Sequence, residues 1–281
     1  MAGNSPEEAQ YQDQFPKLTL EQDGQAFHAY LKLFGRYLAY NPVLIRQFSF
    51  QMATLANLFI SVPKLDPIGR LYLWIAEQAF EFGELPAQKE RLQQLTDQYS
   101  ADDSSAVTVT ELADTLANRA LTISETAALS KTFRQKNLTI AYVHGHFRTF
   151  TPSSVIFLLN AQLQADVLFV GIETAERTEQ FKGKKVFFTD AQRGDAFRKL
   201  YPFTFFIDNS MPYTSEGYAS LLAQINPHRY IGQANNPEWQ KNAMRARADA
   251  LGIEYVELAS IPGFSTSRLS EAFQEHFGDW W

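Results

Sequence analysis

The sequence predicts an all-helical N-terminal domain followed by an α/β domain, in which helices flank a doubly wound, five-stranded parallel sheet. Two observations lead to this prediction. Up to Arg134, apolar residues recur at intervals of three and four, which is the period of an amphipathic helix. From Leu138 on, short apolar runs alternate with helix-length segments, which is typical of parallel strands joined by crossover helices. The expected domains are therefore residues 1–136 and 137–281.

The composition fits a folded protein of one large or two ordinary domains. The chain has 281 residues, and 45% of them are hydrophobic, which suffices for a substantial core. Its net charge of −6 argues against a nucleic-acid partner, because surfaces that bind phosphate backbones gather Lys and Arg. The sequence contains no cysteine, so disulfides, thiol chemistry and cysteine-based metal sites are excluded for these residues.

No membrane span is expected. Residues 1–17 contain neither a basic n-region nor an apolar h-region, so a signal peptide is not expected and a cytoplasmic location is predicted. The longest uncharged stretch, residues 47–63, is shorter than the roughly 20 apolar residues that a spanning helix needs, and it contains several amides. We expect it to form a buried core helix.

The N-terminal half is expected to be a bundle of short-linked helices. Three apolar stripes predict its first helices, at Phe27–Leu38, Val43–Phe59 and Ile68–Phe82. The links contain Asn41-Pro42 and Val62-Pro63, and Asp66-Pro67 has the pattern of an N-cap followed by a first-position proline. Further helices are expected at Pro86–Tyr99, Thr108–Ala120 and Ile123–Arg134.

In the C-terminal half, strands and helices should alternate. Strands are expected at Leu138–Val143, Asp166–Ile172, Phe203–Asp208, Arg229–Gly232 and Tyr255–Ala259. Helices are expected at Ser153–Gln164, Ala191–Tyr201, Ser215–Ile225, Pro237–Leu251 and Ser267–His276. In such sheets ligands bind beyond the carboxyl ends of the strands, where the strand order reverses. The turn after the first strand, residues 145–154, should line that crevice.

This turn carries a resemblance to a known family. Its sequence, GHFRTFTPSS, resembles the first motif, GxFDxxHxGH, of the cytidylyltransferase-like nucleotidyltransferases. Gly145 and Phe147 match, whereas Arg148 stands in place of the motif's Asp, and Thr151 and Ser154 stand in place of its two histidines. Further resemblances follow in order along the chain: the family's second strand at Ala165–Ile172, its Lys-Gly pair at Lys182-Gly183, the arginine of the next helix at Arg193, and the closing STS motif at Gly263–Leu269.

The resemblance implies a Rossmann-like nucleotidyltransferase domain for the C-terminal half. Members of this family transfer a nucleotidyl group from CTP or ATP, with Mg²⁺, to a phosphate or phosphorylated alcohol and release pyrophosphate. The protein must then hold two anions together and stabilise charge on the α-phosphate. Because Thr151 and Ser154 bring no positive charge, we expect binding of a nucleotide or phosphorylated small molecule with transfer weak or lost. Whether the chain is an enzyme stays open at this point.

The resemblance also names candidate site residues. It assigns the catalytic positions to Thr151, Ser154 and Lys182. Ligand contacts are expected at Gly145, His146, Phe147, Arg148, Arg193, Gly232, Ser265, Thr266 and Ser267; His146 and Arg148 are included because either could meet a phosphate in place of the lost histidines. The alternatives are structural: His146 as a hydrogen-bonded strand-end side chain, Arg148 as a partner of an acidic residue, and Ser265–Ser267 as an ordinary helix cap. No protein metal site is expected, because no carboxylate lies near His144 and His146 in the sequence.

The helical half supports a second hypothesis. A non-enzymatic scaffold could use it to bind a protein partner or a second copy of the chain. Most of its aromatic stripe is expected to form core, however, so a binding groove is the minor interpretation. A change in melting temperature with nucleotide would favour the first hypothesis.

Overall fold

The computed structural model describes Leu38 and residues 42–60, 66–83, 120–148, 151–183, 186 and 188–259. The chain forms two compact units, which are described separately. One comprises Met1–Tyr99, Phe150–Leu159 and Ser260–Trp281, and the other comprises Ser100–Thr149 and Asn160–Ala259. The domain boundary expected after residue 136 stays a prediction.

The first unit contains two long helices that pack against each other, α3 (Pro42–Ile60) and α4 (Asp66–Gly83). Both were predicted from their apolar stripes. Their contact includes the rings of Phe59 and Tyr72, whose centroids lie 5.0 Å apart. The Ser49 hydroxyl donates to the carbonyl of Ala76 at 2.6 Å, which satisfies a buried polar group between the helices. The uncharged stretch from residue 47 therefore lies in a core helix, as expected.

Some of the predicted helices cannot be compared with the structure. The helices predicted at Phe27–Leu38, Pro86–Tyr99, Thr108–Ala120 and Ser267–His276 lie outside the described residues, apart from Leu38 and Ala120. Among the helices that the structure describes, none is both long and apolar enough to cross a membrane.

Gly69 sets how closely α3 and α4 approach. A Cβ atom at this position would lie 2.8 Å from the Ala56 carbonyl oxygen and 2.8 Å from the Ile60 nitrogen, both backbone atoms. We expect Gly69→Ala to push the helices apart, with a cost of about 1–3 kcal/mol that exceeds the gain in helix propensity. Thermal unfolding followed by circular dichroism should show a lower midpoint. Gln47→Ala, at an exposed position on α3, is the control and should leave the midpoint unchanged.

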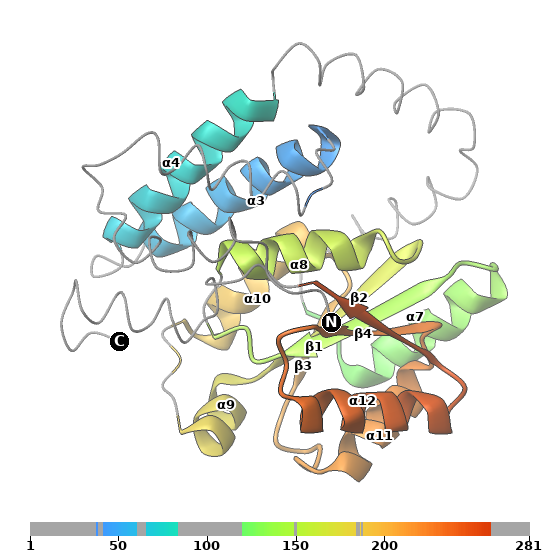
Figure 1. The fold of residues 1–281 in the computed structure, drawn as a ribbon. Helices are drawn as coiled ribbons and strands as arrows, with labels where there is room; N and C mark the ends of the chain where they lie inside the picture. Colours follow the sequence, from blue (N-terminus) through green and yellow to red (C-terminus); the bar gives the residue numbers. More distant parts are fainter. Residues whose placement is uncertain are drawn as a thin grey trace. The chain divides into compact units, whose positions relative to one another are not determined.

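The second unit is built on a five-stranded parallel sheet with the order β3-β2-β1-β4-β5 (Figure 1). The strands are β1 (Ile140–Gly145), β2 (Val167–Glu173), β3 (Thr204–Ile207), β4 (Arg229–Gln233) and β5 (Glu254–Leu258). The chain builds outward from β1 to β3 and then crosses to β4 on the other side. The predicted doubly wound α/β fold is therefore confirmed, and the strand order reverses between β1 and β4.

Helices follow the strands as expected, with one addition. They are α7 (Ile123–Gln135), α8 (Pro152–Gln162), α9 (Ala175–Lys182), α10 (Asp190–Leu200), α11 (Ser215–Ile225) and α12 (Glu238–Ala250). The sequence analysis did not predict α9, because its eight residues are mostly polar and show no apolar stripe. Local capping defines it instead: the Thr174 hydroxyl accepts from the Arg177 N–H, and Gly183 ends the helix with a left-handed φ of 60°.

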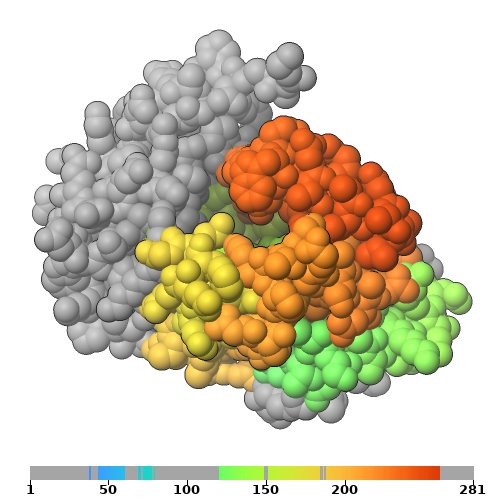
Figure 2. Space-filling view, turned by 90° about the horizontal axis from the view of Figure 1, so that it is seen from below, coloured from blue at the N-terminus to red at the C-terminus, as the bar shows by residue number. Residues whose placement is uncertain are grey.

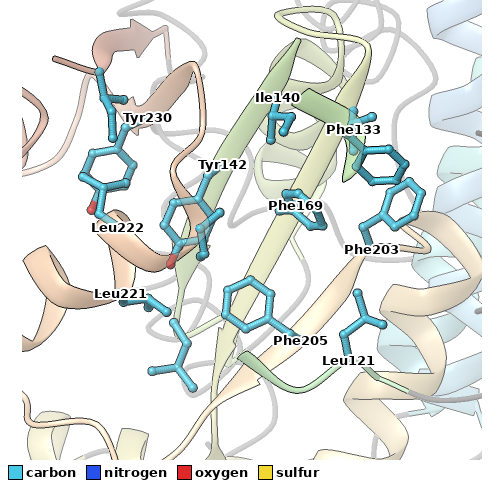
Figure 3. Close-up of a cluster of buried hydrophobic side chains, with 14 of the residues drawn as sticks. Leu121, Phe133, Ile140, Tyr142, Phe169, Phe203, Phe205, Leu221, Leu222 and Tyr230 are labelled. Atoms are coloured by element: carbon cyan, nitrogen blue, oxygen red, sulfur yellow. The ribbon is translucent and has the colours of Figure 1, made fainter. Parts of the chain in front are cut away.

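One face of the sheet packs against α7, α11 and α12 (Figure 1). Alternate strand residues point to this face, among them Tyr142, Phe169, Phe205 and Tyr230, and Figure 3 shows their rings with Leu221 and Leu222 of α11. On the opposite face, α10 lies close to β3, where a Cβ at Gly194 would meet the Phe206 ring at 3.1 Å.

Candidate ligand-binding site at the carboxyl edge of the sheet

The turn after β1 is folded back on itself. Phe147 adopts a left-handed φ of 38°, which is unusual for a residue with a side chain. Its ring covers Gly145, where an added Cβ would meet it at 3.2 Å, and it packs against Phe197 of α10 with ring centroids 5.0 Å apart. Two of the predicted ligand contacts, Gly145 and Phe147, therefore pack against each other at the end of the strand.

His146 lies at the centre of a set of polar contacts. Its Nδ1 is 3.1 Å from the Thr178 hydroxyl, and its Nε2 is 3.5 Å from the Tyr213 hydroxyl. Burial, together with the charges of Lys182, Arg177 and Arg193, lowers the pKa of His146 to about 4. The imidazole is therefore neutral near pH 7, so it cannot replace the positive charge of the missing motif histidines.

Arg193 contacts His146 at its backbone carbonyl and not at its imidazole. Its guanidinium is fully buried and donates to the carbonyls of His146 and Glu173, each at 2.9 Å, and to the carboxylate of Asp190. Burial lowers the pKa of Arg193, and Asp190 opposes that change. These contacts hold the ends of β1 and β2 against α10, so most of the guanidinium's hydrogen-bonding capacity is used within the fold.

Thr151 and Ser154, which stand where the resembled motif has histidines, form a helix cap in the other compact unit. Thr151 is buried and accepts a hydrogen bond from the Ser154 N–H at 3.1 Å, and the two hydroxyls lie 3.0 Å apart. This is the N-cap geometry expected before Pro152 at the first position of α8. Neither hydroxyl carries charge.

The remaining predicted residues are dispersed. Lys182 is exposed at the last position of α9, and Arg148 is half-buried after the β1 turn. Gly232, on β4, is covered by Tyr255, whose hydroxyl would lie 2.4 Å from an added Cβ. Residues 265–267 lie outside the described residues.

A buried ion pair, which the sequence analysis missed, occupies the end of β2. Glu173 and Arg177 are each 1% exposed and form a direct salt bridge. The Tyr218 hydroxyl donates to the second Glu173 oxygen at 2.5 Å. Burial raises the pKa of Glu173, while Tyr218 and Arg177 hold it down. Both carboxylate oxygens are therefore engaged by groups of the protein itself.

Arg177 is also surrounded by aromatic rings and carbonyls. The guanidinium carbon lies 5.0 Å from the Tyr213 ring centroid and 5.5 Å from that of Phe181, and these two rings stack with centroids 4.1 Å apart. Nη1 donates to the Asp208 carbonyl at 3.1 Å and to the carbonyl of Met211. Arg177 therefore links β2, α9 and the segment between β3 and α11.

His144 lies on the sheet face toward α11, within a stack of phenol rings. Its ring centroid is 4.9 Å from that of Tyr218 and 5.7 Å from those of Tyr142 and Tyr230. The Tyr230 hydroxyl is 3.2 Å from its Nδ1. Burial, and then the nearby Arg247, lower the pKa of His144 to about 3. The His144 side chain is therefore neutral near pH 7. As a residue His144 is half-buried, whereas Tyr142 beneath it is 1% exposed.

The space-filling view shows a hollow. It is bordered by the yellow atoms of α9 and the red-orange residues of α12 and β5 (Figure 2). Within the part of the chain that the structure describes, no group of three or more His, Asp or Glu side chains could hold a metal ion. The Glu173 carboxylate binds Arg177 and Tyr218.

One sequence signal could have identified the ion pair. Glu173 ends a predicted strand and precedes Arg177 by four residues, with the potential cap Thr174 between them. This spacing places a carboxylate and a guanidinium on the same side of a helical turn. By contrast, the contribution of Tyr218 depends on the packing of α11, and its distance of 45 residues from Glu173 gives no local signal.

Comparisons with known proteins do not identify a family for this chain. No family model matches the sequence, and no curated protein matches it. Among similar solved structures is the lipopolysaccharide core biosynthesis protein from Thermoplasma volcanium GSS1, with 12% sequence identity and a TM-score of 0.36. The similarity covers 44% of this chain and 96% of that protein. A similarity at this level carries no argument about function, so the chain's own residues must do so.

Proposed function

We propose that the protein is a divergent cytidylyltransferase-like protein that binds a nucleotide or a phosphorylated small molecule at the carboxyl edge of its sheet without efficient nucleotidyl transfer. The observation that carries this proposal is the pair Thr151 and Ser154. Their hydroxyls bond to each other at the N-terminus of α8, where the resembled motif has two histidines.

The loss of charge is the physical reason to expect little transfer. In the transition state, charge builds up on the α-phosphate, and charge-assisted hydrogen bonds stabilise it more than neutral ones do. His146, Arg193 and Arg177 do not restore this charge. His146 has a pKa of about 4, and Arg193 and Arg177 are each paired with a carboxylate. Losing several kcal/mol of stabilisation would slow the reaction by orders of magnitude, since about 1.4 kcal/mol corresponds to a factor of ten.

Binding is supported by the topology and by the surface. The strand order reverses between β1 and β4, which is where open parallel sheets accept ligands. In the space-filling view a hollow lies beside the yellow atoms of α9 and the red-orange atoms of α12 (Figure 2). We include CTP or ATP among the candidate ligands, with Mg²⁺ arriving on the nucleotide's phosphates, because Mg²⁺ commonly reaches a site bound to substrate phosphates.

The test combines melting curves with a turnover assay on the full-length protein. Millimolar CTP or ATP with Mg²⁺ should raise the melting temperature, because a ligand that prefers the folded state stabilises it. With a panel of phosphosugars and phosphoalcohols as acceptors, pyrophosphate release should stay at the level of the enzyme-free control. A melting temperature that no ligand raises would contradict the proposed binding. Pyrophosphate release above the enzyme-free control would contradict the proposed loss of nucleotidyl transfer.

A non-enzymatic scaffold is the second candidate. It is supported by two apolar side chains on the helical unit that remain accessible, Phe50 at 65% and Leu73 at 38%. A protein partner or a second copy of the chain could cover them. Flat melting curves across the ligand panel would favour this candidate over the first.

A further inference from the structure

Phe181, in the last turn of α9, is an exposed aromatic residue to which the proposed function gives no role. It is 40% exposed, although one face of its ring is covered. The Tyr213 ring lies against that face, with the ring centroids 4.1 Å apart and the ring planes inclined by only 6°. The accessible surface of Phe181 therefore lies away from Tyr213.

Arg177 does not cover the second face of the Phe181 ring. Its guanidinium carbon lies 5.5 Å from the Phe181 centroid and 5.0 Å from the Tyr213 centroid. Because the two rings stack face to face, a group at nearly equal distances from both lies beside the stack, level with the gap between the rings. A group over the outer face of Phe181 would lie much farther from Tyr213 than from Phe181. Tyr213 and Arg177 thus both leave this outer face open.

The stack is held in place by groups of the second unit. Arg177 is buried and donates to the carbonyls of Asp208 and Met211, in the segment that carries Tyr213. Tyr213 also meets the Tyr218 ring edge to face, with centroids 5.7 Å apart. An aromatic surface that is already fixed loses little conformational entropy when a ligand binds to it.

The surroundings of this surface favour a ligand that has both a flat ring and a negative charge. Nucleobases stack on aromatic side chains whatever their identity, because every base has a π-face. Lys182 follows Phe181 directly, is exposed and brings a positive charge. Glu179, the carboxylate one turn earlier on α9, accepts a hydrogen bond from the Val186 N–H at 3.0 Å. A nucleotide combines a planar base with an anionic phosphate.

We propose that the outer face of the Phe181 ring stacks against the base of a bound nucleotide. The inference rests on the proposed function, and it narrows the ligand from any phosphorylated small molecule to a nucleotide. The space-filling view shows the yellow atoms of α9 at the surface, beside the hollow (Figure 2). Since stacking reads only the π-face, purine and pyrimidine nucleotides should both bind.

The test measures binding of AMP, CMP and ribose 5-phosphate to the full-length protein by calorimetry. Ribose 5-phosphate has the sugar and phosphate of a nucleotide but no base. The wild type should bind AMP and CMP about tenfold more tightly than ribose 5-phosphate. Phe181→Ala should weaken AMP binding by about tenfold and leave ribose 5-phosphate binding unchanged. Phe181→Trp keeps an aromatic face and should bind AMP like the wild type.

Leu163→Ala is the matched control. Leu163 is another exposed apolar residue of the second unit, 56% accessible, and it lies before the amino end of β2. This variant should bind all three ligands like the wild type, and circular dichroism should show that every variant is folded.

Two results would overturn the stacking surface and leave the proposed function intact. One is equal affinity of the wild type for AMP and ribose 5-phosphate, and the other is AMP binding that Phe181→Ala leaves unchanged. Binding of none of the three ligands by the wild type would also overturn the stacking surface. The proposed function itself would be contradicted only if no ligand of its wider panel raised the melting temperature.

Discussion

Glu173→Gln should destabilise the second unit more than any exposed charge substitution. The change leaves the Arg177 guanidinium, which is 1% exposed, without its carboxylate partner. Breaking a buried ion pair by removing one partner typically costs about 3–5 kcal/mol, because an uncompensated charge stays buried. The free energy of unfolding, measured by urea titration followed by circular dichroism, should fall by about this amount.

The matched control is Glu254→Gln, the same substitution in an exposed pair. Glu254 and Arg229 lie 2.9 Å apart, but their side chains are 60% and 39% exposed. Pairs of this kind contribute about 0–1 kcal/mol, so this variant should unfold close to the wild type. A double variant, Glu173→Gln with Arg177→Met, should be more stable than Glu173→Gln alone, since it removes the unpaired charge. Equal effects of the two single substitutions would contradict a structural role for the buried pair.

This ion pair also illustrates how far the sequence could predict the structure. The strands of the α/β unit were predictable because each is a short apolar run between turn residues, and α11 was predicted at Ser215–Ile225, its observed bounds. The capping of α8 by Thr151 could likewise be read locally. Such features depend on neighbours within a few positions along the chain.

The site was harder to predict, because it depends on contacts between residues far apart in the sequence. Arg193 was expected near a ligand, but the fold directs it to the carbonyls of His146 and Glu173. Arg247 carries no motif and lies near the end of a polar helix, yet its long side chain reaches the aromatic layer on the sheet. Charge and spacing can identify a basic residue, but which anion or carboxylate it meets is decided by tertiary packing.

As the pH is lowered, the second unit should begin to lose stability near pH 6.5, before carboxylates take up protons. His144 has a pKa of about 3 and His146 a pKa of about 4 in the folded protein, whereas an unfolded histidine has a pKa of about 6.5. Below pH 6.5 the unfolded chain therefore binds more protons than the folded one, so stability is full above this pH and falls as the pH is lowered. The two histidines together should remove about 4 kcal/mol between pH 7 and pH 5.

His144→Phe separates this effect from other titrating groups. Phenylalanine keeps a ring in the stack with Tyr218 but cannot take up a proton. The variant should be less stable than the wild type at pH 8, because the Tyr230 hydroxyl loses its hydrogen-bond partner. Between pH 7 and pH 5, however, it should lose about 2 kcal/mol less stability than the wild type, because one histidine fewer takes up a proton on unfolding. Urea titrations at each pH provide the measurement, and the range from pH 7.5 to 8.5, where neither histidine titrates, serves as the internal control. Parallel curves for the variant and the wild type below pH 7 would mean that His144 is not held neutral by the fold.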